Sequence, residues 1–280
     1  MGRSVDGTRI AVTGGAQGIG RALAERLVRG GAQMALGDVD VERAQRTAVE
    51  IGHGTIAVEL DVSDRASFDK FLDEATDRLG GLDVLVNNAG IMPIGPYLDE
   101  SDAVTDRTVD VDLRGVLIGS KLAGHRFAAQ GHGHVVNIAS VLGTIASPNA
   151  ATYCATKHAV IGFGEALRQE WAGSGVALST VCPGFVRTEL IAGMDASPAM
   201  ERFLMVDAEQ VARATADVIA RGRSRNAYVP LTAGVGGVTS RLLPAAVRDR
   251  LFRAAGGHKV TENIDQNRRA AYRQRVERGL

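Results

Sequence analysis

The sequence is poor in the residues that mark secreted, membrane or metal-binding proteins. Only two of its 280 residues are cysteines, Cys154 and Cys182, and they do not form a CxxC pair. Two such cysteines cannot build a disulfide framework or a closed zinc site. No apolar run approaches the ~18 residues of a membrane span, and no charged-then-apolar leader opens the chain. We therefore expect a cytoplasmic protein in a reducing compartment, with no bound metal.

Proline is also scarce, with 7 residues, whereas glycine is frequent, with 34. Glycine reaches positive φ at little cost, so this balance predicts many tight turns. Apolar residues make up 45% of the chain and charged residues 23%, which excludes collagen, coiled coils and disorder. Domains average ~100–200 residues and open α/β sheets run longer, so the length favours one large domain.

The chain has no net charge, but its charges are unevenly distributed. Residues 241–280 carry ten basic and four acidic side chains, a net charge of +6, and the preceding 240 residues carry −6. This asymmetry indicates either a basic tail with a separate role or one solvated helix face. Only Phe252 and Tyr272 are aromatic in this tail, so nucleic-acid binding is not expected.

Short β-branched runs alternate with longer helical patterns. Parallel strands need long crossovers, and strands covered on both faces are apolar throughout, so the pattern predicts a doubly wound α/β fold with helices on both faces of a parallel sheet. The expected strands are Arg9–Thr13, Gln33–Gly37, Thr55–Leu60, Val84–Asn87, His134–Ala139, Val176–Cys182 and Ala227–Val229. The expected helices are Arg21–Arg29, Glu42–Ile51, Ser67–Leu79, Ala103–Ala129, Thr156–Ala172 and Ala208–Arg221.

A glycine-rich turn follows the first expected strand and opens the first helix. It reads Thr13-Gly14-Gly15-Ala16-Gln17-Gly18-Ile19-Gly20. In this context glycines let the backbone approach a pyrophosphate, and the helix N-terminus offers unpaired N–H groups to it. The turn therefore predicts a dinucleotide site rather than a purely structural loop.

Asp38 ends the second expected strand, 18 residues beyond Gly20. A carboxylate there can accept hydrogen bonds from an adenosine ribose diol, or it can cap the following helix. Its neighbours Asp40 and Glu42 are acidic, and the glycine turn has Gln17 where a basic residue could hold a 2′-phosphate. These residues favour NAD over NADP.

Tyr153 and Lys157 are four residues apart, which places them one above the other on a helix face. A cation beside a tyrosine favours the phenolate and brings proton transfer into range, although a lysine at this spacing also occurs by chance. Ser140 ends a buried strand at the edge where open α/β sheets bind ligands. Its hydroxyl can donate to a substrate oxygen, or it can simply cap the strand end.

Together these residues resemble the classical short-chain dehydrogenase/reductase family, in its single-domain Rossmann form. The match covers about residues 5–230, so the predicted domain is 1–230 with a mainly seven-stranded sheet, followed by a C-terminal extension, 231–280. The motifs that carry the resemblance occur in the family's order: the glycine turn, Asp61-Val62, Asn87-Asn88-Ala89-Gly90, Ser140, Tyr153 to Lys157, and Pro183-Gly184 followed by Val186 and Thr188.

The resemblance implies a role for each matched position. Tyr153 would be the acid/base, Lys157 would bind the nicotinamide ribose and lower the tyrosine pKa, and Ser140 would orient the substrate carbonyl. The remaining positions imply cofactor contacts: Gly14, Gln17, Gly18, Ile19 and Gly20 with the phosphates, Asp61 and Val62 with adenine, Asn88, Ala89 and Gly90 with the ribose and central sheet, and Pro183, Gly184, Val186 and Thr188 with nicotinamide.

One position departs from the family pattern. The family's catalytic asparagine, which steadies a water on the proton path from the lysine, falls here on Asp112 in Val111-Asp112-Leu113-Arg114-Gly115. An ionised Asp has the same shape but only accepts hydrogen bonds. Asp112 is therefore expected either to hold the relay water or to bond only to its own helix or to Arg114.

The substrate site is expected to be apolar. The segment Glu189–Met205 lies where the family keeps its substrate loop, and it contains Leu190, Ile191, Met194, Met200, Phe203, Leu204 and Met205. With Met92, Ile94, Val141 and Leu142, these residues favour a hydrophobic alcohol or ketone, although many of them would also serve as ordinary core.

The tail contains a possible helix with Leu243, Val247, Leu251 and Ala254 on one side, ending at Gly256-Gly257. Its aliphatic residues predict that it docks, over the cleft or on a partner subunit; contact with an anionic membrane is not favoured. His132 and His134 are interpreted as turn residues, and Cys154 as a packing residue.

We therefore expect an NAD-dependent oxidoreductase that interconverts a secondary alcohol and its ketone, as a homodimer or homotetramer. The alternative is a catalytically weak NAD-binding protein with a regulatory or scaffolding role. Asp112 and the unexplained tail motivate this alternative.

Overall fold

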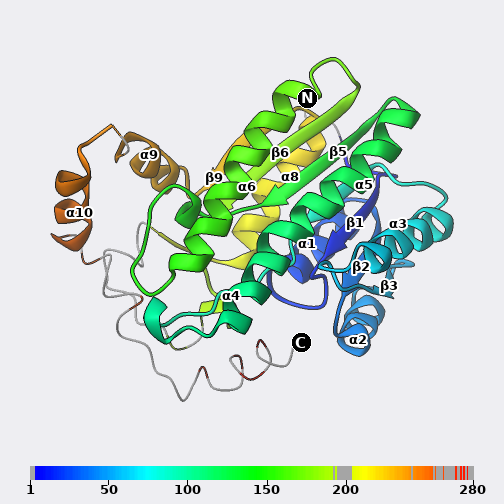
Figure 1. Cartoon of the computed structure of the whole chain (residues 1–280). Helices are drawn as coiled ribbons and strands as arrows, with labels where there is room; N and C mark the ends of the chain where they lie inside the picture. Colours follow the sequence, from blue (N-terminus) through cyan, green and yellow to red (C-terminus); the bar gives the residue numbers. More distant parts are fainter. Residues whose placement is uncertain are drawn as a thin grey trace.

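The computed structural model describes residues 4–191, 193, 204–240, 242–254, 256, 261, 269, 272, 274 and 276. Its centre is a parallel sheet of seven strands in the order β3-β2-β1-β4-β5-β6-β9 (Figure 1). The strand order reverses between β1 and β4, which is where open α/β sheets bind ligands. The strands are β1 (Arg9–Thr13), β2 (Gln33–Asp38), β3 (Ile56–Glu59), β4 (Val84–Asn87), β5 (Gly133–Ile138), β6 (Val176–Pro183) and β9 (Arg225–Val229).

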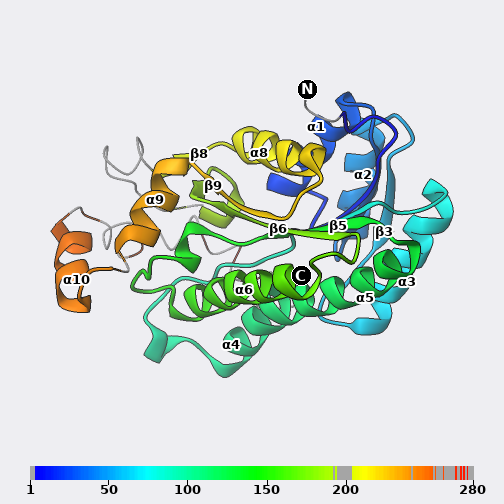
Figure 2. The same ribbon diagram turned by 90° about the horizontal axis from the view of Figure 1, so that it is seen from above.

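Helices cover both faces of this sheet (Figure 2). One layer consists of α1 (Gly18–Arg29), α2 (Val41–Ile51) and α8 (Ala208–Arg221), and the other of α3 (Arg65–Leu79), α5 (Gly115–Gln130) and α6 (Ala151–Glu170). Each layer buries its own apolar core against the sheet. The predicted doubly wound fold is confirmed.

Short elements shape the carboxyl edge of the sheet. The helix α4 (Asp102–Val109) leads through a π-turn, η2 (Asp110–Arg114), into α5. The others are η1 (Tyr97–Asp99), η3 (Val141–Gly143), η4 (Glu189–Ile191) and the two-residue strands β7 (Phe185–Val186) and β8 (Met205–Val206), which pair with each other.

The local sequence explains where the helices begin and end. Asp40 caps α2 by accepting from the Arg43 N–H, and Asp64 caps α3 by accepting from the Ala66 N–H. The helix α3 ends at Gly80, whose left-handed φ of +71° favours glycine.

Two predicted helices have different bounds in the structure. The single helix expected over Ala103–Ala129 is divided by the π-turn, whose extra residue per turn is invisible to a 3.6-residue apolar pattern. The helix α6 begins at Ala151 rather than Thr156, so Tyr153 lies in its first turn.

The C-terminal extension begins with α9 (Leu231–Ser240) and α10 (Ala245–Ala254). Figure 1 shows α10 standing away from the sheet. The stripe expected to be buried is exposed within this chain, with Leu251 56% exposed. The domain boundary at residue 230 stays a prediction, and Gly257 and Met194, Met200 and Phe203 of the expected substrate loop lie outside the described residues.

Within the described residues, none of the helices combines the length and the apolar character needed to traverse a bilayer.

His134 is a buried member of β5, as the strand expected over His134–Ala139 implied, and its separate interpretation as a turn residue is wrong. Its Nε2 lies 2.9 Å from Ser179 Oγ on the neighbouring strand β6. Gly133 already belongs to β5, and the turn lies earlier, at Gly131, whose φ is +75°. Burial lowers the pKa of His134 to about 4.

This burial predicts acid sensitivity. The unfolded chain takes up a proton on His134 below a pKa of ~6.5, while the folded protein resists doing so until about pH 4. The free energy of unfolding should therefore fall by about 3 kcal/mol from this residue between pH 6.5 and 4. His134→Gln should remove that part of the pH dependence in urea unfolding, and the exposed control His125→Gln should keep it. Equal pH dependence in His134→Gln and the parent would contradict the assignment.

Candidate active site

The glycine turn is tied to the end of β4 by a set of hydrogen bonds. Thr13 Oγ1 accepts from the backbone N–H groups of Asn88 and Ala89, each at 3.0 Å. Asn88 Nδ2 donates to the carbonyl oxygens of Thr13, at 2.9 Å, and Gly14, at 3.1 Å. A Cβ on Gly14 would lie 2.9 Å from the Ala89 Cα, so the close approach of these two segments requires glycine.

The N-terminus of α1, which is the positive end of its helix dipole, faces this turn. Within the described part of the chain, no side chain caps this helix and no acidic residue lies in its first turn. Gln17, at the N-cap position, has a buried Oε1 with no hydrogen-bond partner among the described residues. The uncapped helix start suits an anionic ligand. The unpaired Gln17 Oε1 is an acceptor and suits a hydrogen-bond donor of the ligand, such as a hydroxyl or an amide.

Asp38 lies at the end of β2 and faces the same turn. Its carboxylate accepts from the backbone N–H of Ala16 at 2.9 Å and of Asp40 at 3.1 Å. Burial raises the pKa of Asp38. Asp40, not Asp38, caps α2, so the capping alternative for Asp38 is wrong.

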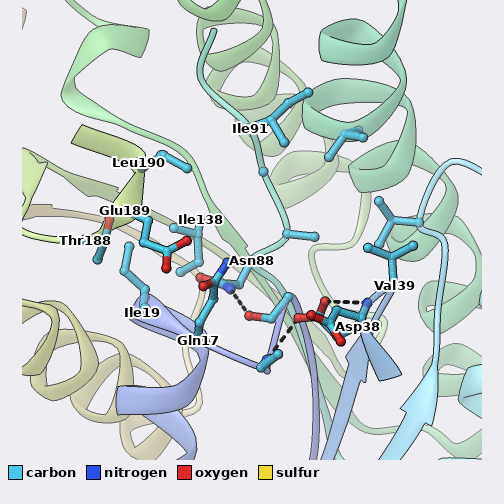
Figure 3. Close-up of a pocket in the computed structure, with 18 of the residues that line it drawn as sticks. Gln17, Ile19, Asp38, Val39, Asn88, Ile91, Ile138, Thr188, Glu189 and Leu190 are labelled. Atoms are coloured by element: carbon cyan, nitrogen blue, oxygen red, sulfur yellow. Dashed lines mark hydrogen bonds between the residues drawn. The ribbon is translucent and has the colours of Figure 1, made fainter. Parts of the chain in front are cut away.

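These residues line one cleft of about 770 Å³. Figure 3 shows Asp38 and Val39 on one side of it, Thr188, Glu189 and Leu190 on the other, and Gln17 and Asn88 between them. The cleft collects most of the predicted cofactor residues: Gly14, Gln17, Gly18, Ile19, Asp38, Asp61, Val62, Asn88, Ala89, Gly90, Tyr153, Lys157 and Thr188.

Three predicted residues lie in an adjoining smaller pocket, and one lines neither space. Pro183, Gly184 and Val186 line a pocket of about 50 Å³ together with Ser140 and Tyr153. Gly20 instead packs against the turn, where a Cβ would collide with the Gly14 carbonyl oxygen. Its role is to let α1 approach the turn closely.

Tyr153, Lys157 and Ser140 converge where the two spaces meet. Lys157 Nζ lies 5.4 Å from the centre of the Tyr153 ring, and both side chains are buried. Ser140 hydrogen-bonds to the Tyr153 side chain, and its Oγ also accepts from the Leu142 N–H at 3.1 Å. Ser140 therefore combines contact with the tyrosine and the strand-end capping that were weighed as alternatives.

Burial raises the pKa of Tyr153 above its ordinary value. The charge of Asp112 raises it further, while the hydrogen bond with Ser140 lowers it. Burial is the largest cause of this raised pKa, and the lowering by Lys157 that the family resemblance implies stays a prediction. Tyr153 is consequently protonated at neutral pH.

Asp112 lies behind Lys157 and is fully buried. Its Oδ1 accepts from the Ile91 N–H at 2.7 Å, and its Oδ2 is 3.6 Å from Lys157 Nζ. Arg114 pairs instead with Asp110, at 3.4 Å, so the proposed local pairing of Asp112 with Arg114 is wrong. The π-turn that contains Asp112 turns this carboxylate inward, toward the lysine.

The smaller pocket has an apolar lining. Met92, Leu142, Phe185, Leu190 and Ile191 surround it beside Ser140 and Tyr153. Cys154 belongs to the same buried apolar cluster, which agrees with its interpretation as a packing residue.

Several cleft residues were missed by the sequence analysis. Arg43 reaches from α2 to Glu189 of η4, with 3.4 Å between Arg43 Nη2 and Glu189 Oε1. Tyr272 and Val276, from the C-terminal extension, line the cleft as well. Arg43 could have been suspected from its position one turn after Asp38, but no pattern in the tail singled out Tyr272 or Val276.

Comparison with known proteins agrees with this geometry. Residues 8–198 match the family model described as short chain dehydrogenase. The chain belongs to the short-chain dehydrogenase family. It is therefore an oxidoreductase, and the resemblance expected from its motifs is confirmed.

Two curated members of the short-chain dehydrogenase family align with most of the chain. Sorbitol dehydrogenase of Cereibacter sphaeroides is 37% identical over 193 residues, which cover 69% of this chain and 75% of that protein. Cis-4-hydroxycyclohexanecarboxylate dehydrogenase of Sinomonas cyclohexanicum is 39% identical over 195 residues, covering 67% and 77%.

A solved structure of the same fold is 3-ketoacyl-(acyl-carrier-protein) reductase from Brucella melitensis, complexed with NADH. It is 28% identical, with a TM-score of 0.73, and covers 81% of this chain and 98% of that chain. The family match ends at residue 198, so the C-terminal extension lies beyond it.

Proposed function

We propose that this short-chain dehydrogenase uses NAD to interconvert a hydrophobic secondary alcohol and its ketone, with Tyr153 as the acid/base. The observation that carries the proposal is the meeting of Tyr153, Lys157 and Ser140 at the inner end of a cleft whose outer end has the glycine turn and Asp38. The outer end of the cleft suits a bound dinucleotide. The side chains at the inner end suit proton transfer to a substrate oxygen.

The residues present fit a dinucleotide. The uncapped start of α1 suits the pyrophosphate, and Asp38 has carboxylate lone pairs beside the cleft for a ribose diol. The unpaired Gln17 Oε1 can accept from a hydroxyl or an amide of the ligand. The negative charge of Asp38 disfavours the additional phosphate of NADP. When bound, the nicotinamide supplies or accepts hydride.

The chain's own residues provide the proton chemistry. Tyr153, protonated at neutral pH, donates its proton to the oxygen of a ketone, and Ser140 orients that oxygen through its hydroxyl. In the opposite direction Tyr153 must first lose its proton. Lys157, packed beside the phenol ring, stabilises the negative charge that then develops.

The apolar pocket supports the substrate class. A hydrophobic alcohol replaces water there without leaving the surrounding side chains unsatisfied. The relatives act, by their names, on sorbitol and on a hydroxycyclohexanecarboxylate, both of which carry secondary alcohols. A panel of apolar secondary alcohols offered to the purified protein with NAD, followed by NADH absorbance, tests the proposal.

A second candidate is a catalytically weak NAD-binding protein with a regulatory role. Asp112 favours it, because a carboxylate 3.6 Å from Lys157 Nζ raises the tyrosine pKa and opposes the lysine. Binding of NAD without turnover of any alcohol or ketone would select this candidate. A homodimeric or homotetrameric assembly and a cytoplasmic location stay predictions.

Tyr153→Phe is expected to abolish turnover, because the variant keeps the ring but loses the group that transfers the proton. NAD affinity, measured by calorimetry, should stay within about threefold of the parent, well under ~1 kcal/mol. The exposed Tyr97→Phe is the matched control and should retain full activity. Undiminished turnover in Tyr153→Phe would remove the proposed mechanism.

Asp38→Ala is expected to erode the preference for NAD over NADP by about 1–3 kcal/mol, the usual cost of losing a charged hydrogen bond. Calorimetric titration of both cofactors into parent and variant gives the ratio directly. Asp77→Ala, an exposed carboxylate on α3, serves as the control. Equal affinity of the parent for NAD and NADP would contradict the role proposed for Asp38.

Asp112→Asn should shift the alkaline rise of kcat/KM for alcohol oxidation to lower pH. The negative charge of Asp112 raises the tyrosine pKa, so its removal means that less base is needed to form the phenolate. Activity near neutral pH should stay within about tenfold, or ~1.4 kcal/mol of barrier. Superimposable pH profiles for the two proteins would show that Asp112 does not act on Tyr153.

A further inference from the structure

The C-terminal extension is anchored to the rest of the protein on either side of the helices α9 and α10. Its first helix, α9, follows β9 directly, at the carboxyl edge of the sheet. Further along the chain, Arg269 donates to the carbonyl oxygen of Leu190 at 2.9 Å and to that of Met92, and the Tyr272 hydroxyl accepts from the Met92 N–H at 2.7 Å. The two helices are therefore held near the edge of the sheet at which the active site lies.

The helix α9 packs closely against this edge. Its buried face consists of small residues: Ala233, Gly234 and Gly237. A Cβ on Gly234 would collide with the Tyr228 side chain, and a Cβ on Gly237 would collide with Thr144 Oγ1. Thr144 follows η3, the short turn after Ser140. The inner face of α9 thus has no room for larger side chains and is fixed beside the active-site end of the sheet.

The large aliphatic side chains of α9 lie on its outer face. Leu231, Val235 and Val238 follow one another at intervals of four and three residues, so they share one side of the helix. They are 69%, 57% and 49% exposed, and Leu242, just beyond the helix, is 85% exposed. A surface helix of a globular protein normally turns such residues toward the core. Their display on the outside indicates an apolar partner.

The helix α10 adds exposed aliphatic residues and borders them with arginines. Val247 and Leu251, one turn apart, are 42% and 56% exposed, and the helix stands away from the sheet (Figure 1). Arg250 lies three residues after Val247, and Arg248 lies three residues before Leu251. This spacing places one arginine on each side of the aliphatic pair. Asp249, the one acidic residue in the sequence of α10, falls on the opposite side of the helix.

We propose that α9 and α10 form a membrane-binding surface for an anionic lipid bilayer. Amphipathic helices with aliphatic residues on one face and basic residues beside them lie in the plane of a membrane surface. The arginine stems can follow the apolar face while their guanidinium groups reach the lipid phosphates. Residues 231–256 contain four arginines and one acidic residue, so the surface has the charge that attracts anionic headgroups.

A second copy of this chain is the alternative occupant of the surface. In a two-fold contact the same surface occurs on both sides, so the arginines of one copy would come close to those of the other. Anionic headgroups bring charges of the opposite sign instead. Charge complementarity therefore favours the bilayer. The sequence analysis did not favour a membrane, but it expected the aliphatic stripe of α10 to be docked, and the structure leaves that stripe exposed within this chain.

Flotation of the full-length protein with lipid vesicles tests the proposal. The parent should bind vesicles made of equal parts of phosphatidylglycerol and phosphatidylcholine at least about tenfold more strongly than vesicles of phosphatidylcholine alone. High salt should weaken this binding, because it screens the attraction between the arginines and the headgroups. A parent that does not bind the anionic vesicles overturns the proposal.

Substitutions on the outer faces identify the surface that binds. Leu251→Asp and Val235→Asp should each weaken binding to the anionic vesicles by at least about tenfold, and Arg250→Glu should weaken it in the same direction. Val49→Asp, at an exposed valine of α2, and Arg78→Glu, at an exposed arginine of α3, are the matched controls and should bind like the parent. All five positions are exposed, so thermal unfolding should stay unchanged. Undiminished binding by both Leu251→Asp and Val235→Asp overturns the proposal.

Light scattering without lipid distinguishes the bilayer from a second copy of the chain. If α9 and α10 bind lipid, Leu251→Asp and Val235→Asp keep the molar mass of the parent. If a second copy covers this surface, the two variants form a smaller assembly than the parent, and that result overturns the proposal. None of these measurements depends on turnover of an alcohol or a ketone, so the proposal is tested independently of the proposed function.

Discussion

The hydrogen bonds between Thr13 and Asn88 hold the two halves of the molecule in register. They join the ends of β1 and β4, the neighbouring strands at which the order of the sheet reverses. The glycine turn and Asp38, which would hold the adenosine side of a cofactor, follow β1 and β2, whereas Ser140 follows β5 and Tyr153 and Lys157 lie in α6.

Asp112 illustrates how the site tolerates a buried charge. A lone carboxylate without exposure is costly, and here one oxygen accepts from a backbone N–H while the other faces Lys157. The arrangement stabilises the lysine in place, but it places a negative charge near Tyr153. At this position the carboxylate stabilises Lys157 but makes the Tyr153 phenol harder to ionise.

Much of the site could be predicted because its motifs are local. The glycine turn and the pair Tyr153 and Lys157 depend on spacing within one turn or one helix, which the sequence displays directly. The π-turn could not be predicted, because its apolar residues fit an ordinary helix equally well. His134 received two incompatible interpretations, as the first residue of an expected strand and as a turn residue beside Gly133, and its pairing with Ala177 of β6 decides for the strand.

The contacts of Arg269 and Tyr272 could not be predicted from the sequence, for a different reason. Their partners are backbone atoms of Met92 and Leu190, which carry no sequence pattern. An arginine in a tail of net charge +6 suggests a solvated surface, whereas this one is buried by satisfying two carbonyls. Composition describes the tail as a whole and cannot identify the few residues that dock.

The strand order also bears on how the protein is made on the ribosome. The sheet starts at its centre with β1, grows outward through β2 and β3 to one edge, and then restarts beside β1 with β4, β5, β6 and β9. Each strand thus emerges beside a neighbour that has already been synthesised, and no strand waits for one still to come.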